Sequence, residues 1–218
     1  MASIDFYYLP LSAPCRSVLM VAKAVGVTLN LKPTDIMAGE NRTPEFLKMN
    51  VQHTIPTMDD GGFYLNESRA MLQYLANKYG KDDSLYPKDP EARARVDMKL
   101  LFDMGTLYAK FGEAYYPAIF GKTTLDPAKV EKFEEVLDFL DEYLTASKYV
   151  AGDNLTIADY AVASSLSTIE AAGHDLSKHG KTVAYLAKLK EEIDGYAELN
   201  QEGADQFGGW AKGAIQKA

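Results

Sequence analysis

The sequence has 218 residues, a length that allows one large domain or two small ones. Its composition, with 47% hydrophobic and 25% charged residues, is typical of a globular protein. The 23 Lys and Arg residues against 31 Asp and Glu residues give a net charge of −8, which repels polyphosphates and anionic membrane surfaces. We therefore expect no nucleic-acid or membrane partner.

The cysteine content and the N-terminal segment indicate the compartment. Cys15 is the single cysteine, which excludes an intramolecular disulfide and a multi-cysteine metal site. Residues 1–17 lack a basic region, and Asp5, Pro10 and Pro14 interrupt their apolar stretch, so they do not resemble a secretory signal. Uncharged stretches such as residues 6–15 are far shorter than the roughly 18 residues of a membrane span. The sequence thus predicts a cytoplasmic protein.

The first third of the chain alternates between strand and helix periodicity. Residues 4–9 resemble a buried strand, and residues 17–25 have the apolar spacing of a helix that Gly26 ends. The segment Asp-Asp-Gly-Gly at 59–62 joins two short strands as a hairpin. The predicted order is strand, helix, strand, helix, hairpin and helix, over residues 4–9, 17–25, 27–31, 44–49, 57–58 with 63–65, and 66–80.

The rest of the chain is predicted to be helical. Charge and prolines concentrate in KDDSLYPKDP, and we place a linker at residues 83–90, between an α/β domain at 1–82 and an all-α domain at 91–218. Thr156 and Asp159 have the spacing of a capping box, which indicates a structural role. Helical spacing covers residues 92–120, 127–147, 156–172, 182–193 and 204–212.

The segment Ser12-Ala-Pro-Cys15 lies between the first predicted strand and helix. Free backbone N–H groups and the helix dipole favour an anion such as a thiolate there. A structural alternative is that Ser12 only caps a helix with Pro14 in its first turn. The spacing is that of a Cys-x-x-Cys motif whose first cysteine is replaced by serine, so dithiol chemistry is lost.

Two further segments carry groups suited to a peptide ligand. Ile55-Pro56 precedes a short strand and is a candidate cis peptide, which would turn backbone polar groups toward an extended peptide. Ser68 and the N–H groups at the start of the third helix suit a carboxylate, while Glu67 suits an ammonium group. Ordinary helix capping and a solvated Arg69 are the structural alternative.

Together, the segments YYLPLSAPCRS, QHTIPT, NESRA, FDMGTLY and TIAD resemble the cytosolic glutathione transferases, most closely the delta class that uses serine. The resemblance covers essentially the whole chain. It implies a thioredoxin-like first domain, a helical second domain and a homodimer. It further implies a detoxification enzyme that conjugates glutathione, its co-substrate, to apolar electrophiles without another cofactor.

The resemblance assigns roles residue by residue. Ser12 matches the catalytic serine, whose hydroxyl hydrogen-bonds the glutathione sulfur. The positions that match glutathione-binding residues are Asn41, Gln52, His53, Ile55, Glu67, Ser68 and Arg69. The positions expected to face the apolar substrate are Leu9, Ala13, Pro14, Tyr108, Phe111, Tyr115, Tyr116, Ile119, Phe120 and Phe207.

Four positions depart from the family pattern, namely Leu11, Asn41, Val51 and Asn66. Asn41 can hydrogen-bond a carboxylate but carries no charge, so a lower glutathione affinity is expected. His174 and His179 match no part of the pattern, and we predict solvated loop histidines and no metal site.

Two alternative functions stay open from the sequence. A protein of the same fold could sequester hydrophobic ligands with little turnover. Cys15 could also serve as a nucleophile for thiol exchange, although its position three residues after Ser12 predicts a buried, inert thiol.

Overall fold

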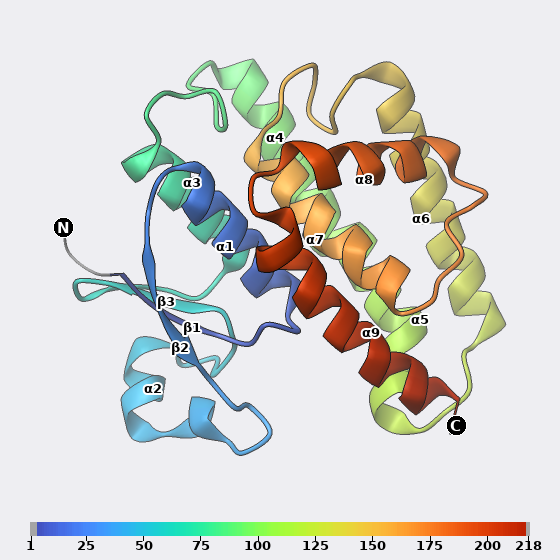
Figure 1. Ribbon diagram of the computed structural model, residues 1–218, viewed down its shortest axis with the longest axis horizontal. Helices are drawn as coiled ribbons and strands as arrows, with labels where there is room; N and C mark the ends of the chain where they lie inside the picture. The colour runs from blue at the N-terminus through green and yellow to red at the C-terminus, as the bar shows by residue number, and fades with distance from the viewer. Residues whose placement is uncertain (1–3, 217–218) are drawn as a thin grey trace.

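The computed structural model describes residues 4–216 and contains a sheet-bearing N-terminal domain beside a helical C-terminal domain (Figure 1). The sheet has the strand order β2-β1-β3-β4. Strand β1 is parallel to β2 and antiparallel to β3, and β3 is antiparallel to β4. The strands are β1 Ile4–Tyr8, β2 Leu29–Pro33, β3 Thr57–Asp60 and β4 Phe63–Leu65.

Three helices complete the N-terminal domain: α1 Ala13–Ala24, α2 Pro44–Met49 and α3 Ser68–Tyr79. Helices α1 and α3 lie on one side of the sheet and α2 on the other (Figure 1). Helix α1 buries Cys15, Val18 and Ala22, which recur at helical spacing and so form one apolar face. It ends where Gly26 adopts a φ of +76°, a conformation that glycine accepts without steric cost.

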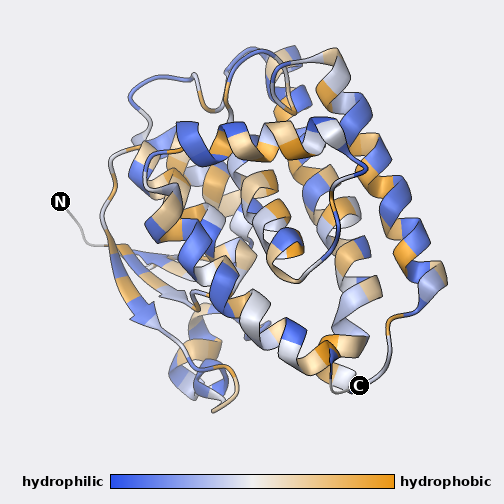
Figure 2. Ribbon diagram, turned by 45° about the vertical axis from the view of Figure 1, so that its right-hand side comes forward, coloured by the Kyte–Doolittle hydropathy of each residue, from blue (hydrophilic) through white to orange (hydrophobic). Residues whose placement is uncertain are grey.

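The C-terminal domain packs five helices around a central one, α7, which is buried along almost its whole length (Figure 1). The capping box predicted at its start is confirmed, since Asp159 accepts from the backbone N–H of Thr156 at 2.7 Å. Figure 2 shows that the outer helices carry both hydrophilic and apolar residues, as helices with one buried face do. The helices are α4 Pro90–Phe102, α5 Tyr108–Gly121, α6 Pro127–Ala146, α7 Ile157–Ala171, α8 Gly180–Glu192 and α9 Glu202–Ile215.

Three predicted elements need correction. The first helix begins at Ala13 and not at residue 17, because Pro14 and Cys15 already lie in its first turn. The second strand covers Leu29–Pro33 and not 27–31, because its register is set by pairing with β1, in which Ile4 lies opposite Leu29. The single helix predicted over 92–120 is interrupted by a π-helical turn at Asp103–Leu107, where the fully buried Asp103 carboxylate takes polar partners from other helices. Within residues 4–216, no helix is both long and apolar enough to cross a membrane.

Candidate active site

Three loops that carry predicted site residues meet at one end of the sheet. Tyr7, near the end of β1, lies opposite Thr57 at the start of β3, and Met58 lies opposite Leu65 at the end of β4. Because β1 and β4 are both antiparallel to β3, the chain segments after β1, before β3 and after β4 all leave this end. The sheet therefore brings together the loops that contain Ser12, Ile55 and Ser68.

Ser12 precedes α1 in an extended conformation, with φ −80° and ψ 115°. Its carbonyl accepts from the N–H groups of Cys15 and Arg16 at 3.0 and 3.1 Å, and its own N–H donates to Leu9 at 3.0 Å. In the part of the chain that the structure describes, its side chain makes no capping hydrogen bond. The Ser12 hydroxyl therefore does not act as a simple helix cap. Ser12 is half-buried beside the start of α1.

Cys15 lies one turn into α1, and its side chain has no exposed surface. Burial raises the pKa of its thiol to about 11, although hydrogen bonding to Ser12 and Leu9 acts in the opposite direction. The prediction of a buried thiol is confirmed. A thiol with this pKa is almost entirely protonated at neutral pH, so Cys15 is not suited to nucleophilic exchange.

The Ser12 loop is attached to the helical domain through Arg16, a buried residue on α1. Its guanidinium donates to the Asn200 carbonyl at 2.8 Å, to Asn200 Oδ1 at 2.9 Å and to Ser167 Oγ at 3.2 Å, and it also bonds Thr168 Oγ1. Gly203 on α9 packs so closely that an added Cβ would lie 2.2 Å from the Pro10 carbonyl oxygen. Helices α7 and α9 therefore fix the backbone that carries Ser12.

The loop before β3 is organised by two asparagines. The Asn50 amide nitrogen donates to the Thr54 carbonyl at 3.0 Å and to Thr57 Oγ1 at 2.9 Å, and Asn50 Oδ1 accepts from the Gln52 N–H at 2.9 Å. Asn41 is buried, and its amide nitrogen donates to the His53 carbonyl at 2.5 Å. Asn41 thus fixes the backbone of this loop at His53 from the buried side.

The residues on this loop lie at different depths. His53 has a positive φ of +46° and is half-buried, as is Ile55, whereas Gln52 is exposed. The Ile55–Pro56 bond is cis, as predicted.

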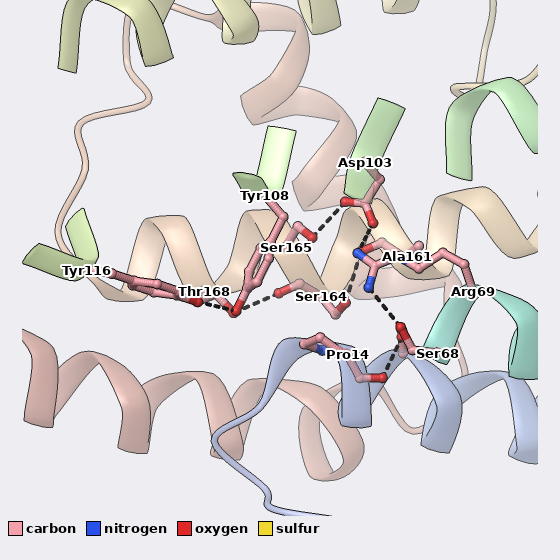
Figure 3. A network of polar contacts seen from close by, with 11 residues as sticks. Pro14, Ser68, Arg69, Asp103, Tyr108, Tyr116, Ala161, Ser164, Ser165 and Thr168 are labelled. Atoms are coloured by element: carbon pink, nitrogen blue, oxygen red, sulfur yellow. Dashed lines mark hydrogen bonds and ion pairs between the residues drawn. The ribbon is translucent and has the colours of Figure 1, made fainter. Parts of the chain in front are cut away.

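At the start of α3, Arg69 connects the two domains. It donates to Ser68 Oγ at 2.8 Å and forms an ion pair with Asp103, whose other carboxylate oxygen accepts from Ser165 Oγ at 2.7 Å (Figure 3). Asp103 is fully buried, so this arrangement is well shielded from solvent. Glu67, one residue before the helix, is exposed. Arg69 is therefore a fixed residue and not the solvated side chain of the structural alternative.

Aromatic side chains connect α5 to α9 in the C-terminal domain. The Tyr116 hydroxyl donates to that of Tyr108 at 2.7 Å, and the Tyr116 ring contacts Phe120 edge to face at 5.3 Å between centroids. Phe120 in turn contacts Trp210 at 4.9 Å. Phe120 is 59% exposed and Trp210 44%, so these rings offer apolar surface to a ligand. Leu9 and Pro14 are half-buried.

Five of the residues predicted to face an apolar substrate lie in the core instead. Phe111 has no accessible surface, stacks on Tyr115 and contacts Phe133 at a tilt, and the Tyr115 hydroxyl bonds His174 at 2.8 Å. Phe111 and Tyr115 lie on the face of α5 that packs against Phe133 of α6. Ala13 and Phe207 are buried on α1 and α9. The prediction is corrected for the buried residues Ala13, Phe111, Tyr115, Ile119 and Phe207.

The prediction of solvated histidines at 174 and 179 is also wrong. Both are buried, and both face Glu134 on α6, at 3.4 Å from His174 Nε2 and 2.8 Å from His179 Nε2. Burial lowers the pKa of His174. They join α6 to the segment before α8.

From the sequence, we did not identify the buried polar residues whose hydrogen bonds fix the site loops. These residues are Arg16, Asn50, Asp103, Ser165 and Asn200. The sequence does contain an indication for Asp103. It occupies a buried position between Leu100 and Leu107 in helical spacing, where an unpaired charge would be costly, so a charged partner could have been expected. The sequence contains no such indication for Asn50 and Asn200, since a single asparagine in a loop or helix is common at the surface.

The comparisons with known proteins agree with this architecture. Residues 6–83 match the glutathione S-transferase N-terminal domain, and residues 106–192 match the glutathione S-transferase C-terminal domain. A delta-class glutathione transferase of Nilaparvata lugens is 56% identical over 97% of this chain and 99% of its own, with a TM-score of 0.95. The glutathione transferase BmGSTD1 of Bombyx mori is 46% identical over 95% and 97%, with a TM-score of 0.93.

A glutathione transferase homolog of Drosophila mojavensis, whose structure contains bound glutathione, is 35% identical over 98% of this chain and 98% of its own, with a TM-score of 0.91. The chain therefore belongs to the glutathione S-transferase family. The thioredoxin-like and helical domains, the enzyme class and the resemblance to the delta class predicted from the motifs are confirmed, and the sequestering alternative is not favoured.

Proposed function

We propose that this enzyme activates glutathione through Ser12 and transfers the resulting thiolate to apolar electrophiles. The observation that carries the proposal is the Ser12 hydroxyl, which is half-buried at the start of α1 and free of a capping bond among the described residues. Such a hydroxyl donates to a sulfur placed beside it. Ser12 then stabilises the thiolate and forms no bond with the electrophile.

The energetic need for this activation is modest. A free thiol titrates near about 8.5, so only a few per cent is thiolate at pH 7. Each unit by which the pKa falls corresponds to about 1.4 kcal/mol in favour of the anion, and a fall of about two units makes the thiolate the majority form. A hydrogen bond to an ionised acceptor, together with the helix N-terminus, supplies a contribution of this size.

We assign the ends of the tripeptide to the other two loops. Ser68 and the first N–H groups of α3 suit a carboxylate, and the exposed Glu67 suits an ammonium group. Ile55 offers backbone groups to the central residue, and His53 and Gln52 lie along the same loop toward the glycyl end. Arg69 and Asn41 hold these groups in place, through Ser68 and the His53 carbonyl respectively.

For the electrophile we propose the aromatic surface of α5 and α9. Tyr108, Tyr116 and Phe120 contribute from α5, and Leu9 and Pro14 face them from the first loop. Positioning two bound reactants lowers the barrier beyond what thiolate formation alone achieves. The proposed substrates are apolar xenobiotics, and glutathione is the co-substrate, with no other cofactor in the reaction.

We also propose a cytoplasmic homodimer. Met98, Leu101 and Met104 are 52%, 62% and 41% exposed along α4 and the turn that follows it, which is a large apolar surface for a monomer. A second copy of the chain would cover it. Sedimentation analysis should give a dimer, and Leu101→Glu should shift the equilibrium toward the monomer, whereas a monomeric wild-type protein would contradict the proposal.

The activation step is tested by the pH dependence of conjugation to an aromatic halide, with glutathione binding measured in parallel. Ser12→Ala should lower kcat/KM about 10- to 100-fold at pH 7, the worth of one hydrogen bond to a charged acceptor, while glutathione still binds. Ser12→Thr should retain part of the activity because it keeps a hydroxyl.

The matched control is Ser17→Ala, which removes a hydroxyl that bonds the Pro14 carbonyl at 2.9 Å one turn further along α1. It should keep the wild-type pH profile. Equal losses in Ser12→Ala and Ser17→Ala would mean that the helix is merely perturbed.

A further inference from the structure

A cavity lies in the C-terminal domain, away from the three loops of the active site. It has a volume of about 270 Å³ and is bordered by α4, the end of α6 and the segment that follows α6. Arg95 and Ala146 at its border are exposed, so the cavity opens to solvent. Its lining residues are Arg95, Met98, Lys99, Tyr143, Ala146, Ser147, Val150, Ala151 and Gly152.

Lys99 is the unusual member of this lining. The residue is only 5% exposed, and its Nζ lies over the ring of Tyr143, 2.8 Å from the centroid. Within residues 4–216, no carboxylate lies within 4.0 Å of it, and the second cation nearby is Arg95 on the same helix. Buried lysines are normally paired with an anion, whereas Lys99 lies over an aromatic ring at the wall of a cavity, which makes its amine the candidate reactive group there.

This environment favours the neutral amine. Burial among apolar groups lowers the pKa of Lys99 to about 8, and burial is the main cause. The charged and titratable groups that face it are Arg95 from α4 and Tyr143 from α6, and neither supplies a negative charge at neutral pH. At pH 7 about one Lys99 in ten is then neutral, against about one in 2,500 for an ordinary lysine.

We propose that Lys99 is a nucleophile that captures small apolar aldehydes as a reversible imine, independently of glutathione and of Ser12. A lysine desolvated in an apolar pocket is a recognised way to obtain an amine nucleophile at neutral pH. The cavity volume of about 270 Å³ suits only a small ligand, and Met98, Val150 and Ala151 supply apolar lining beside Lys99. The site would retain carbonyl electrophiles that the thiol-transfer site has not consumed.

The chemistry is balanced without a further reactant. The neutral Nζ forms a bond to the carbonyl carbon, and a proton moves from nitrogen to oxygen to give a carbinolamine. Loss of water, as the C–O bond breaks, leaves the imine. Addition of water reverses both steps and returns the aldehyde and the free amine.

The experiment uses the full-length protein with hexanal as the probe and cyanoborohydride to convert the imine into a stable alkylamine. Peptide mass mapping then gives the rate of labelling at each lysine. At pH 7, Lys99 should be labelled at least about tenfold faster than the exposed Lys122, because far more of its amine is neutral. Labelling of Lys99 should level off above about pH 8.

Matched variants separate the environment of Lys99 from its presence. Ala146→Glu places a carboxylate at the border of the cavity and should reduce Lys99 labelling toward that of Lys122, while Ala146→Gln should leave it unchanged. Lys99→Arg should remove the rapid labelling and keep conjugation of glutathione intact. Ser12→Ala should label as the wild type does, so failure of the transferase mechanism would not affect this result. Labelling of Lys99 no faster than that of Lys122 in the folded wild-type protein would overturn the proposal.

Discussion

Two arginines, Arg16 and the less buried Arg69, join the domains of this enzyme, and their partners differ in charge. Arg69 of α3 forms an ion pair with the buried Asp103. Arg16 of α1 is more deeply buried, yet its partners are the hydroxyls of Ser167 and Thr168 and the oxygens of Asn200. Among the described residues, no carboxylate lies within 4.0 Å of Arg16, and burial lowers its pKa to about 10, which still leaves it charged at neutral pH.

The difference shows two ways to keep a charge inside a protein. Arg69 is compensated by an opposite charge, so each partner depends on the other. Arg16 is compensated by several dipoles, so the loss of one acceptor leaves the others in place. Both arginines lie next to loops of the site and bond to residues of the helical domain. The helical domain therefore helps to fix a site whose main groups lie in the other domain.

The largest expected effect comes from breaking the ion pair. Asp103→Ala leaves Arg69 as an uncompensated, largely buried charge and should destabilise the protein by about 3–5 kcal/mol in denaturant unfolding. The double variant Asp103→Leu with Arg69→Met should recover much of that loss, because it removes both charges. A loss of less than about 1 kcal/mol for Asp103→Ala would show that the pair is solvated and would break the comparison.

A smaller loss is expected at Arg16. Arg16→Lys keeps the charge but cannot reach all its acceptors, and we expect a destabilisation of about 1–3 kcal/mol by the same measurement. Asn200→Ala removes one acceptor residue and should cost less than Arg16→Lys. If Asn200→Ala were as damaging as Asp103→Ala, the dipoles would be acting as one unit and not as independent partners.

The smallest effect is expected from a third buried cluster, that of Glu134 with His174 and His179. Because burial lowers the pKa of His174, the native state binds fewer protons there than the unfolded state. The stability should therefore fall as the pH drops below about 6.5, the ordinary value for histidine, and stop falling below the native pKa.

Unfolding measured across this range should show a shallower dependence on pH for His174→Gln than for the wild type. An unchanged dependence would mean that other groups set it. Arg16, with a pKa of about 10, remains charged over this range and is expected to contribute no such slope.

The sequence predicts the fold well because its signals are local. The periodicity of α1, the glycines of the β-hairpin and the capping box at Thr156 each report on neighbouring residues. The hairpin and the capping box are found where they were expected, and α1 is found with an earlier start. The site loops were located for the same reason. The division of α5 was not predictable, because both of its faces are aromatic and only packing against α6 decides that Phe111 is buried and Phe120 exposed.

The polar contacts between residues far apart in the chain could not be predicted from the sequence either. Nothing near Arg16 or His174 in the chain indicates a partner, since Asn200 and Glu134 lie far away along it. An isolated charged residue usually lies at the surface, so the prediction of solvated histidines followed the common case.

The most direct test of the central claim is to titrate the thiol of bound glutathione by its ultraviolet thiolate absorbance, in the wild type and in Ser12→Ala, at saturating glutathione. The account predicts a wild-type thiol pKa well below about 8.5 and a pKa that returns toward that value when the Ser12 hydroxyl is removed. The same low pKa in both proteins would contradict it and would assign the activation to the helix N-terminus alone.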